Sequence, residues 1–259
     1  MNYTIENKYK VISEHGSKGQ QEKYYRNGYW YKLDSRYNEG KIEHIVSVIL
    51  KHSNITDFVF YNTCTVNNKN ACRSKTFLSK NEIFLTLETI LCDVYGLSSA
   101  DNYLYAITNV KDRFDCLVDA VKKYTNNQLN ITSMLQIILY LDLLILNRDR
   151  HLNNIGIIVD VSNGRYRTAP IFDNGLSLLG GLYGEIYNYG LPAIIQKQSA
   201  RTISGSFVNQ VLAATNNVLK SPLKINFNAV FNELKREETS DYILNVLSYQ
   251  YNQVGSLYE

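Results

Sequence analysis

The spacing of hydrophobic residues changes twice along the first part of the chain. Residues 9–33 favour strands around a glycine-rich turn, and Asn27-Gly28 marks a β-hairpin that leads into an aromatic strand. Residues 38–54 instead place an apolar side chain at every third or fourth position, which predicts an amphipathic helix. Residues 55–66 are rich in aromatic and β-branched side chains and favour one or two further strands.

Helical spacing dominates after residue 80. Residues 81–96 carry this pattern and end at Gly96, a typical helix stop. Residues 112–124 predict a second helix, and residues 206–253 are again helical. The second part of the chain is therefore expected to be mainly α-helical.

The most apolar stretch of the chain predicts a buried helix. Residues 131–146 are apolar nearly all round, and Thr132 or Ser133 could cap the helix at its N-terminus. Residues 155–172 follow with two short strand patterns joined by an Asn-Gly turn. A loop rich in polar residues lies between the helix and these strands.

Together these elements predict an α+β fold with two lobes. We expect a small, strand-rich N-lobe over residues 1–80 and a larger, mainly helical C-lobe over residues 81–259, forming one domain. A cleft between the lobes is expected near residues 75–90.

Composition narrows the function classes. Hydrophobic residues make up 45% and charged residues 20% of the chain, as in soluble globular proteins. The net charge of +3 is too small to indicate direct nucleic-acid binding. Gln136 and Asp142 interrupt the longest apolar run, so no membrane association is expected.

Cysteine spacing and the polar N-terminus suggest a cytoplasmic protein. The four cysteines show neither C-x-x-C pairs nor matching histidines, so reduced thiols are favoured over a zinc site. The first ten residues lack the apolar core of a signal peptide. This pattern leaves export to a host or a neighbouring cell by a specialised route open.

Residues 147–154, NRDRHLNN, hold the strongest candidate chemistry. Asp149 follows the buried helix, so a rigid element would aim its carboxylate at a substrate hydroxyl. Asn154 lies in the same loop, and the two predicted strands would return Asp173 beside it. Asn154 and Asp173 offer hard oxygens suited to Mg²⁺, and Gly175 could free the backbone after Asp173. Turn and capping roles are the alternative for each residue alone.

A glycine-rich stretch near the N-terminus could cover the phosphates of ATP. Its glycines permit close approach of the backbone to a phosphate, whereas an ordinary hairpin turn would look similar. The candidate phosphate-binding residues are Gly16, Ser17, Lys18, Gly19 and Lys23.

Lys32 lies in the aromatic strand after this turn and is the candidate to bind the ATP phosphates. A position on the solvent face of the strand is the alternative. Glu43, on the following helix, is the first choice to hold Lys32 in place, and Glu39 is the second.

Three further residues could support the loop. His151 could donate to phosphate or position the loop, and the second role is favoured. Arg150 could contact phosphate or pair with an acidic residue. Asp142 is costly to bury without a partner, so we expect it to bond with the loop backbone, Arg150 or His151.

These motifs resemble those of the HipA-like serine/threonine kinases, especially the compact members of that family. The resemblance rests on LDLLILNRDRHLNN, PIFDNGLSL and GSKGQQEKYYRNGYWYKL. It implies a bilobal protein-kinase-like fold and phosphorylation of serine or threonine in a protein substrate with ATP and Mg²⁺. By matching position, it implies Asp149 as catalytic base, Asn154 and Asp173 as magnesium ligands, and Lys32 as the ATP lysine.

The resemblance also implies regulation and biological context. Family members autophosphorylate a serine in the glycine-rich loop, for which Ser17 is the first choice here and Ser13 the second. The family suggests a bacterial toxin or effector. The glycine-rich loop starts by residue 16, without the subdomain that precedes it in full-length members, so any antitoxin would be encoded separately.

Two other functions fit part of the pattern. Phosphoinositide-type lipid kinases also carry a D-R-H-x-x-N loop followed by Asp-x-Gly, but the chain shows no basic, apolar segment for a membrane surface. A non-catalytic kinase-like module, regulated by nucleotide, would not need the complete set of candidate residues.

Overall fold

The computed structural model describes residues 1–11, 21–35, 37–237 and 239–259. The expected phosphate-binding residues Gly16, Ser17, Lys18 and Gly19 lie outside the described residues, as does Ser13.

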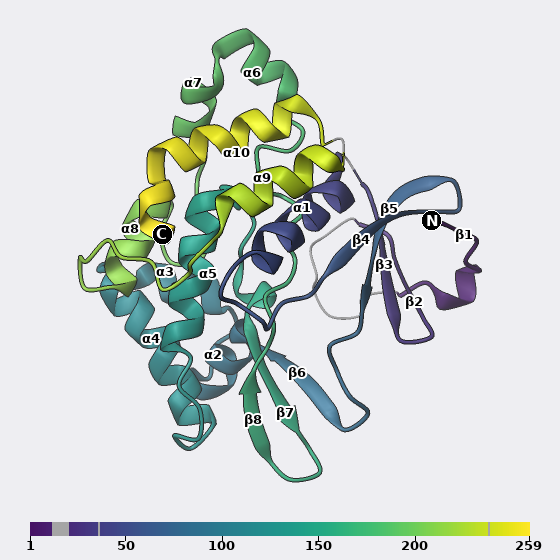
Figure 1. Cartoon of the computed structure of the whole chain (residues 1–259). Helices are drawn as coiled ribbons and strands as arrows, with labels where there is room; N and C mark the ends of the chain where they lie inside the picture. Colours follow the sequence, from purple (N-terminus) through teal and green to yellow (C-terminus); the bar gives the residue numbers. More distant parts are fainter. Residues whose placement is uncertain (12–20, 36, 238) are drawn as a thin grey trace.

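The N-terminal part is built on a five-stranded sheet with the order β1-β4-β5-β3-β2 (Figure 1). The strands are β1 Asn2–Tyr3, β2 Lys23–Arg26, β3 Tyr29–Leu33, β4 Tyr61–Val66 and β5 Lys69–Lys75. Strand β1 is parallel to β4, and the other neighbours are antiparallel. The turn at Asn27-Gly28 has positive φ at both residues, so the predicted hairpin is confirmed.

The two faces of the β2–β3 hairpin have different surroundings. Tyr24, Tyr31 and Leu33 pack into a small hydrophobic core on one face. Lys23 pairs with Lys32 across the hairpin, so the two-residue period of a strand turns both lysines to the opposite face. The candidate ATP lysine therefore points away from this core.

Helix α1, Glu39–Lys51, packs against β4 and β5. Its start needs a glycine, because a Cβ at Gly40 would lie 2.9 Å from the Ala71 carbonyl carbon. At its other end, Lys51 and His52 both contact Glu233 of α9, Phe227–Arg236, at 2.8 and 2.7 Å. The predicted helix is confirmed, and it joins the sheet to the helical part of the chain.

A three-stranded sheet, β6-β7-β8, corrects one prediction. Strands β6 Glu82–Thr86, β7 Gly156–Asp160 and β8 Arg165–Thr168 form it, so the first part of the predicted helix 81–96 is a strand. Pairing with β7, far along the chain, decides the conformation of β6, and local periodicity cannot show this.

The helix begins only at α2, Leu87–Tyr95, where Thr86 accepts a hydrogen bond from the Thr89 amide. Gly96 ends it with a left-handed φ of 66°, as predicted.

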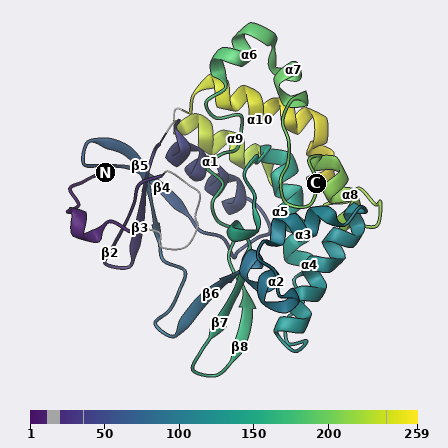
Figure 2. The same cartoon turned by 180° about the vertical axis from the view of Figure 1, so that it is seen from behind.

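The rest of the chain is mainly helical and surrounds α5 (Figures 1 and 2). The helices are α3 Ala100–Ala106, α4 Val110–Tyr124, α5 Thr132–Ile145, α6 Tyr183–Tyr189, α7 Leu191–Gln196, α8 Phe207–Ala214, α9 Phe227–Arg236 and α10 Asp241–Val254. The 3₁₀ turns are η1 Asn7–Tyr9, η2 Leu152–Asn154 and η3 Gly255–Tyr258. The predicted helices at 112–124 and 131–146 and the helical tail are confirmed. The tip formed by α6 and α7 and the β7–β8 hairpin project in opposite directions.

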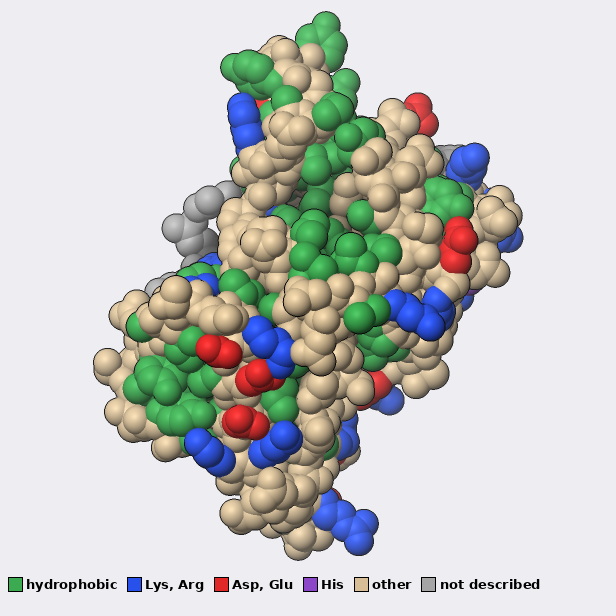
Figure 3. Space-filling view, turned by 90° about the vertical axis from the view of Figure 1, so that its left-hand side faces the viewer, with side chains coloured by type: hydrophobic (Ala, Val, Ile, Leu, Met, Phe, Trp, Pro, Cys, Tyr) green, Lys and Arg blue, Asp and Glu red, His purple; other side chains and the backbone are tan. Residues whose placement is uncertain are grey.

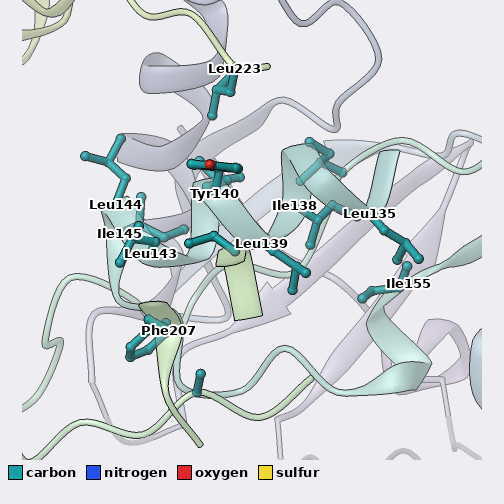
Figure 4. Packing of buried hydrophobic residues seen from close by; sticks show 14 of the residues in the cluster. Leu135, Ile138, Leu139, Tyr140, Leu143, Leu144, Ile145, Ile155, Phe207 and Leu223 are labelled. Atoms are coloured by element: carbon teal, nitrogen blue, oxygen red, sulfur yellow. The ribbon is translucent and has the colours of Figure 1, made fainter. Parts of the chain in front are cut away.

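Helix α5 forms the centre of the core, as its apolar sequence predicts. Leu139 and Tyr140 are buried, and α8 and α10 pack beside the helix (Figure 4). The expected capping by Thr132 or Ser133 is wrong: Ile131 occupies the N-cap position, and Asn130 Oδ1 accepts from the Thr132 amide at 2.9 Å. A side chain just before the helix therefore satisfies an amide that the helix leaves unpaired.

The face shown in Figure 3 has interspersed basic and acidic side chains around hydrophobic patches. Some exposed aromatic residues belong to the α6 tip, where Tyr183, Tyr187 and Tyr189 are exposed. Within the described ranges, no helix has both the length and the hydropathy needed to cross a membrane.

Candidate active site

Three charged side chains from three separate segments meet on the side of the sheet to which Lys32 points. Lys32 Nζ of β3 lies 3.1 Å from Glu43 Oε1 of α1 and 2.6 Å from Asp173 Oδ1. The other oxygen of Glu43, Oε2, accepts from the Asn174 amide at 2.8 Å. This cluster links the hairpin, α1 and the segment after β8.

The alternative partner of Lys32 has a different position. Glu39 accepts hydrogen bonds from the Ser35 amide and hydroxyl and from the Tyr37 amide, and thereby holds the segment that leads into α1. Of the two candidates, Glu43 is therefore the glutamate paired with Lys32.

In this cluster, burial and ion pairing shift the pKa values of the side chains in opposite directions. Burial alone would lower the pKa of Lys32, but Asp173 and Glu43 raise it well above its ordinary value. Burial would likewise raise the pKa of Asp173, yet the charges of Lys32 and Lys23 hold it below its ordinary value. Burial dominates for Glu43, whose pKa is raised despite Lys32. Lys32 and Asp173 are therefore an ion pair at neutral pH.

Lys23 adds a second positive charge to the same side of the sheet. Its pKa is lowered, first by burial and then by repulsion from Lys32, while Asp173 and Glu43 oppose this shift. An anion entering this region would gain from both lysines.

The loop after α5 is held by its own polar groups. The Asp149 amide donates to Asn147 Oδ1 at 3.0 Å. The Asp149 carbonyl accepts from the His151 amide at 2.8 Å and from Asn154 Nδ2 at 3.2 Å. These bonds fix the backbone on both sides of the candidate base and leave its carboxylate partly exposed.

Arg150 joins three parts of the chain beneath this loop. Its Nη2 lies 3.0 Å from Asp142 Oδ1, with the two side chains only 1% and 0% exposed. The same guanidinium donates to the Phe172 carbonyl and to Asn174 Oδ1. The expected pairing of Asp142 with a basic side chain is thus observed, and Arg150 faces protein groups.

His151 lies near the candidate base but outside hydrogen-bond distance. Its Nε2 is 4.0 Å from Asp149 Oδ2, and its buried Nδ1 has no hydrogen-bond partner among the described residues. Burial lowers the pKa of His151, although Asp149 and Asp173 raise it. The imidazole is therefore neutral at pH 7. Both carboxylates influence the His151 pKa, so Asp149 and Asp173 lie in the neighbourhood of this imidazole.

Arg201 is a further member of the site that the sequence pattern did not reveal. Its Nη1 lies 2.6 Å from Asp149 Oδ1. Thr202 Oγ1 donates to the Arg150 carbonyl at 2.9 Å, so the segment before α8 lies against the loop. Asn147 and Asn174 were also missed, although both lie within the recognised motifs.

The donor set suits magnesium better than a metal with an all-protein cage. Among the described residues, no three His, Cys, Asp or Glu side chains form a metal-binding group. Mg²⁺ is usually held by one or two carboxylates together with substrate phosphates and water. Asn154 Nδ2 bonds to the Asp149 carbonyl, which leaves the Asn154 amide oxygen for a ligand, and Asp173 Oδ1 contacts a lysine. Asn154 and Asp173 therefore fit such a site.

Gly175 has a different role from the expected one. Its φ is not in the left-handed region, whereas Asp173 itself has a φ of 61°. A Cβ at Gly175 would lie 3.2 Å from the Glu39 Cβ, so close packing against α1 favours the glycine. The special backbone conformation lies at the candidate metal ligand.

Aromatic side chains lie beside the connection between the sheets. Phe77, Phe84 and Phe172 contact one another with ring centroids 5.4–5.7 Å apart. A cavity next to this cluster includes Lys75, Thr76 and Phe77 in its wall, which overlaps the start of the expected cleft. None of the charged candidate residues lines this cavity. The candidate site therefore rests on the convergence of those side chains.

Comparison with solved structures identifies the fold. The Helicobacter pylori proinflammatory kinase CtkA superposes with a TM-score of 0.66 and 14% identity, over 98% of this chain and 96% of that one. HipA of Shewanella oneidensis, solved with HipB and operator DNA, gives a TM-score of 0.45 and 12% identity, over 93% of this chain and 65% of HipA. No family model and no curated protein matches the sequence. The expected bilobal α+β fold is confirmed, and the chain has the fold of the kinase CtkA.

Proposed function

We propose that the chain is a Mg²⁺- and ATP-dependent serine/threonine protein kinase of the HipA-like type. The main support is the convergence of Lys32, Glu43 and Asp173, together with Asp149 on a rigid loop, within the fold of a kinase. Phosphoryl transfer relies on positioning and electrostatic stabilisation, and this arrangement supplies charges for both.

The residues divide into three functional groups. Lys32, held by Glu43, would exchange its contact with Asp173 for the ATP phosphates, and Lys23 would add charge beside it. Asp173 and Asn154 would hold Mg²⁺, which neutralises phosphate charge when bound. Asp149 would accept a hydrogen bond from the substrate hydroxyl and direct its oxygen toward the γ-phosphorus.

Regulation and context extend this proposal. We propose autophosphorylation at Ser17 or Ser13 in the glycine-rich loop, a role as toxin or effector, and a separately encoded antitoxin where one takes part. We also keep residue 80 as the boundary between the N-lobe and the C-lobe.

Intact mass after incubation with Mg-ATP tests the function. Wild type is expected to gain phosphate, whereas Asp149→Gln, which keeps the side chain polar but cannot accept the proton, is expected to gain none. Peptide mapping and Ser17→Ala then test the modified serine. Wild-type protein that binds Mg-ATP but transfers no phosphate, either to itself or to serine/threonine peptide libraries, would instead support the nucleotide-regulated binding module. Phosphate gain in Asp149→Gln equal to wild type would contradict the catalytic assignment.

A further inference from the structure

Several hydrogen bonds of the segment between α7 and α8 hold Arg201 beside Asp149, the candidate base. Tyr105 Oη donates to the Arg201 carbonyl at 2.6 Å, and the next residue, Thr202, is buried and bonded to the catalytic loop. The Ala200 amide donates to the Gly205 carbonyl and closes the segment on itself. The backbone on both sides of Arg201 is thus fixed from three directions.

The guanidinium of Arg201 keeps most of its binding capacity. An arginine has five N–H donors in a planar fork. In the described part of the chain, Asp149 is the acceptor bonded to the Arg201 guanidinium. The side chains of Arg201 and Asp149 are 43% and 37% exposed, so an incoming ligand can reach both. The remaining donors have no other acceptor among the described residues and can bind a ligand beside Asp149.

We propose that Arg201 binds the phosphoryl group during its transfer, an inference that rests on the proposed kinase function. Arg201 occupies Asp149 Oδ1, which leaves Oδ2 for the substrate hydroxyl. A substrate hydroxyl bound to Asp149 Oδ2 would lie beside the Arg201 guanidinium on Oδ1. A remaining N–H of Arg201 would then reach an oxygen of the phosphoryl group that the hydroxyl attacks. Charge-assisted and bidentate bonds to phosphate are the interactions that arginine makes best.

Phosphoryl transfer needs no reactant besides ATP and the substrate hydroxyl. The bond between the serine or threonine oxygen and the γ-phosphorus forms as the bond from phosphorus to the β-phosphate oxygen breaks. The electron pair of the broken bond stays on ADP, and the hydroxyl proton passes to Asp149 Oδ2. Arg201 exchanges no proton and offsets the charge on the phosphoryl oxygens.

Kinetics of three Arg201 variants test this role, with Arg165→Gln as a matched control. Arg165 is an exposed arginine on the β7–β8 hairpin, outside the site. We expect Arg201→Gln to lower kcat by about 100-fold or more, with KM for ATP changed less than about threefold. Arg201→Lys should retain intermediate activity, and ethylguanidinium in solution should partly restore kcat of Arg201→Ala. A purely structural role would show no such rescue.

The outcomes separate the two proposals. If folded wild type transfers no phosphate, the kinase function fails and this inference fails with it. If wild type is active and Arg201→Gln matches Arg165→Gln, only the role of Arg201 is contradicted. Faster turnover by Arg201→Gln would also contradict it, because Arg201 would then block Asp149 rather than bind phosphate.

Discussion

Two arginine–aspartate pairs share one loop and differ in their surroundings. Arg150 and Asp142 are almost completely buried, whereas Arg201 and Asp149 are each more than a third exposed. Arg150 also donates to the Phe172 carbonyl and to Asn174. Arg201 retains donors that can bind a ligand. The same pair of side-chain types therefore holds the structure together in one place and leaves a carboxylate accessible in the other.

The difference follows from the free energy of desolvation. A buried charge must be paired and hydrogen-bonded, because an uncompensated charge in the interior is strongly unfavourable. Burial raises the pKa of Asp142, and Arg150 opposes this shift. An exposed pair has little net effect on stability, so its partners can separate at a small cost in free energy.

The largest expected effect comes from breaking the buried pair. Arg150→Met leaves Asp142 buried without its cation and should lower the free energy of unfolding by about 3–5 kcal/mol. Arg201→Gln, the matched change at the exposed pair, should lower it by less than about 1 kcal/mol. Urea denaturation followed by circular dichroism measures both.

A double variant separates loss of the pair from loss of packing. Asp142→Leu with Arg150→Met should recover part of the stability that Arg150→Met alone loses, because no buried charge remains. Equal losses of stability in Arg150→Met and Arg201→Gln would show that burial does not distinguish the two pairs.

Asp34 differs from both of these aspartates, because its carboxylate has no ion pair in the described part of the chain. Burial raises the pKa of Asp34 to about 6, although the Gly40 amide, 2.8 Å from Oδ1, opposes the shift. Between pH 4 and 6 the folded state binds more protons at Asp34 than the unfolded state does. The free energy of unfolding therefore falls as pH rises through this range.

Asp34→Asn should remove this contribution while keeping an acceptor for the Gly40 amide. At pH 7 the variant is expected to be more stable than wild type by about 1–2 kcal/mol, and at pH 4 the difference should nearly vanish. Chemical denaturation at both pH values measures the change. A variant less stable than wild type at pH 7 would show that the ionised Asp34 is stabilised by its surroundings.

The sequence was sufficient for the parts of the fold that local periodicity determines. The Asn27-Gly28 turn signal and the aromatic residues after it predicted the first hairpin, and the apolar residues 131–146 predicted the central helix. Strand β6 was missed because its pairing with β7 joins residues 70–78 positions apart. Such pairing overrides the helical pattern that continues into α2.

The candidate site likewise contains residues that the sequence predicts and residues that only the structure reveals. The loop 147–154 and Asp173 were recognised because turn residues and acids recur there at short spacing. The choice of Glu43 over Glu39 needed the direction of α1, which the structure provides. Arg201 lies in an irregular segment without periodicity, and only the packing of that segment on the loop brings it to Asp149.

A calorimetric titration with ATP, in the presence and absence of Mg²⁺, tests most directly whether Lys32 and Asp173 form a Mg-ATP site. Wild type is expected to bind ATP at least about tenfold more tightly with Mg²⁺, because the metal lets Asp173 and the phosphates share a site. Asp173→Asn should lose this dependence on Mg²⁺, and Arg165→Gln should keep it. No binding of ATP by wild type, or equal affinity with and without Mg²⁺, would contradict the assignment of this site.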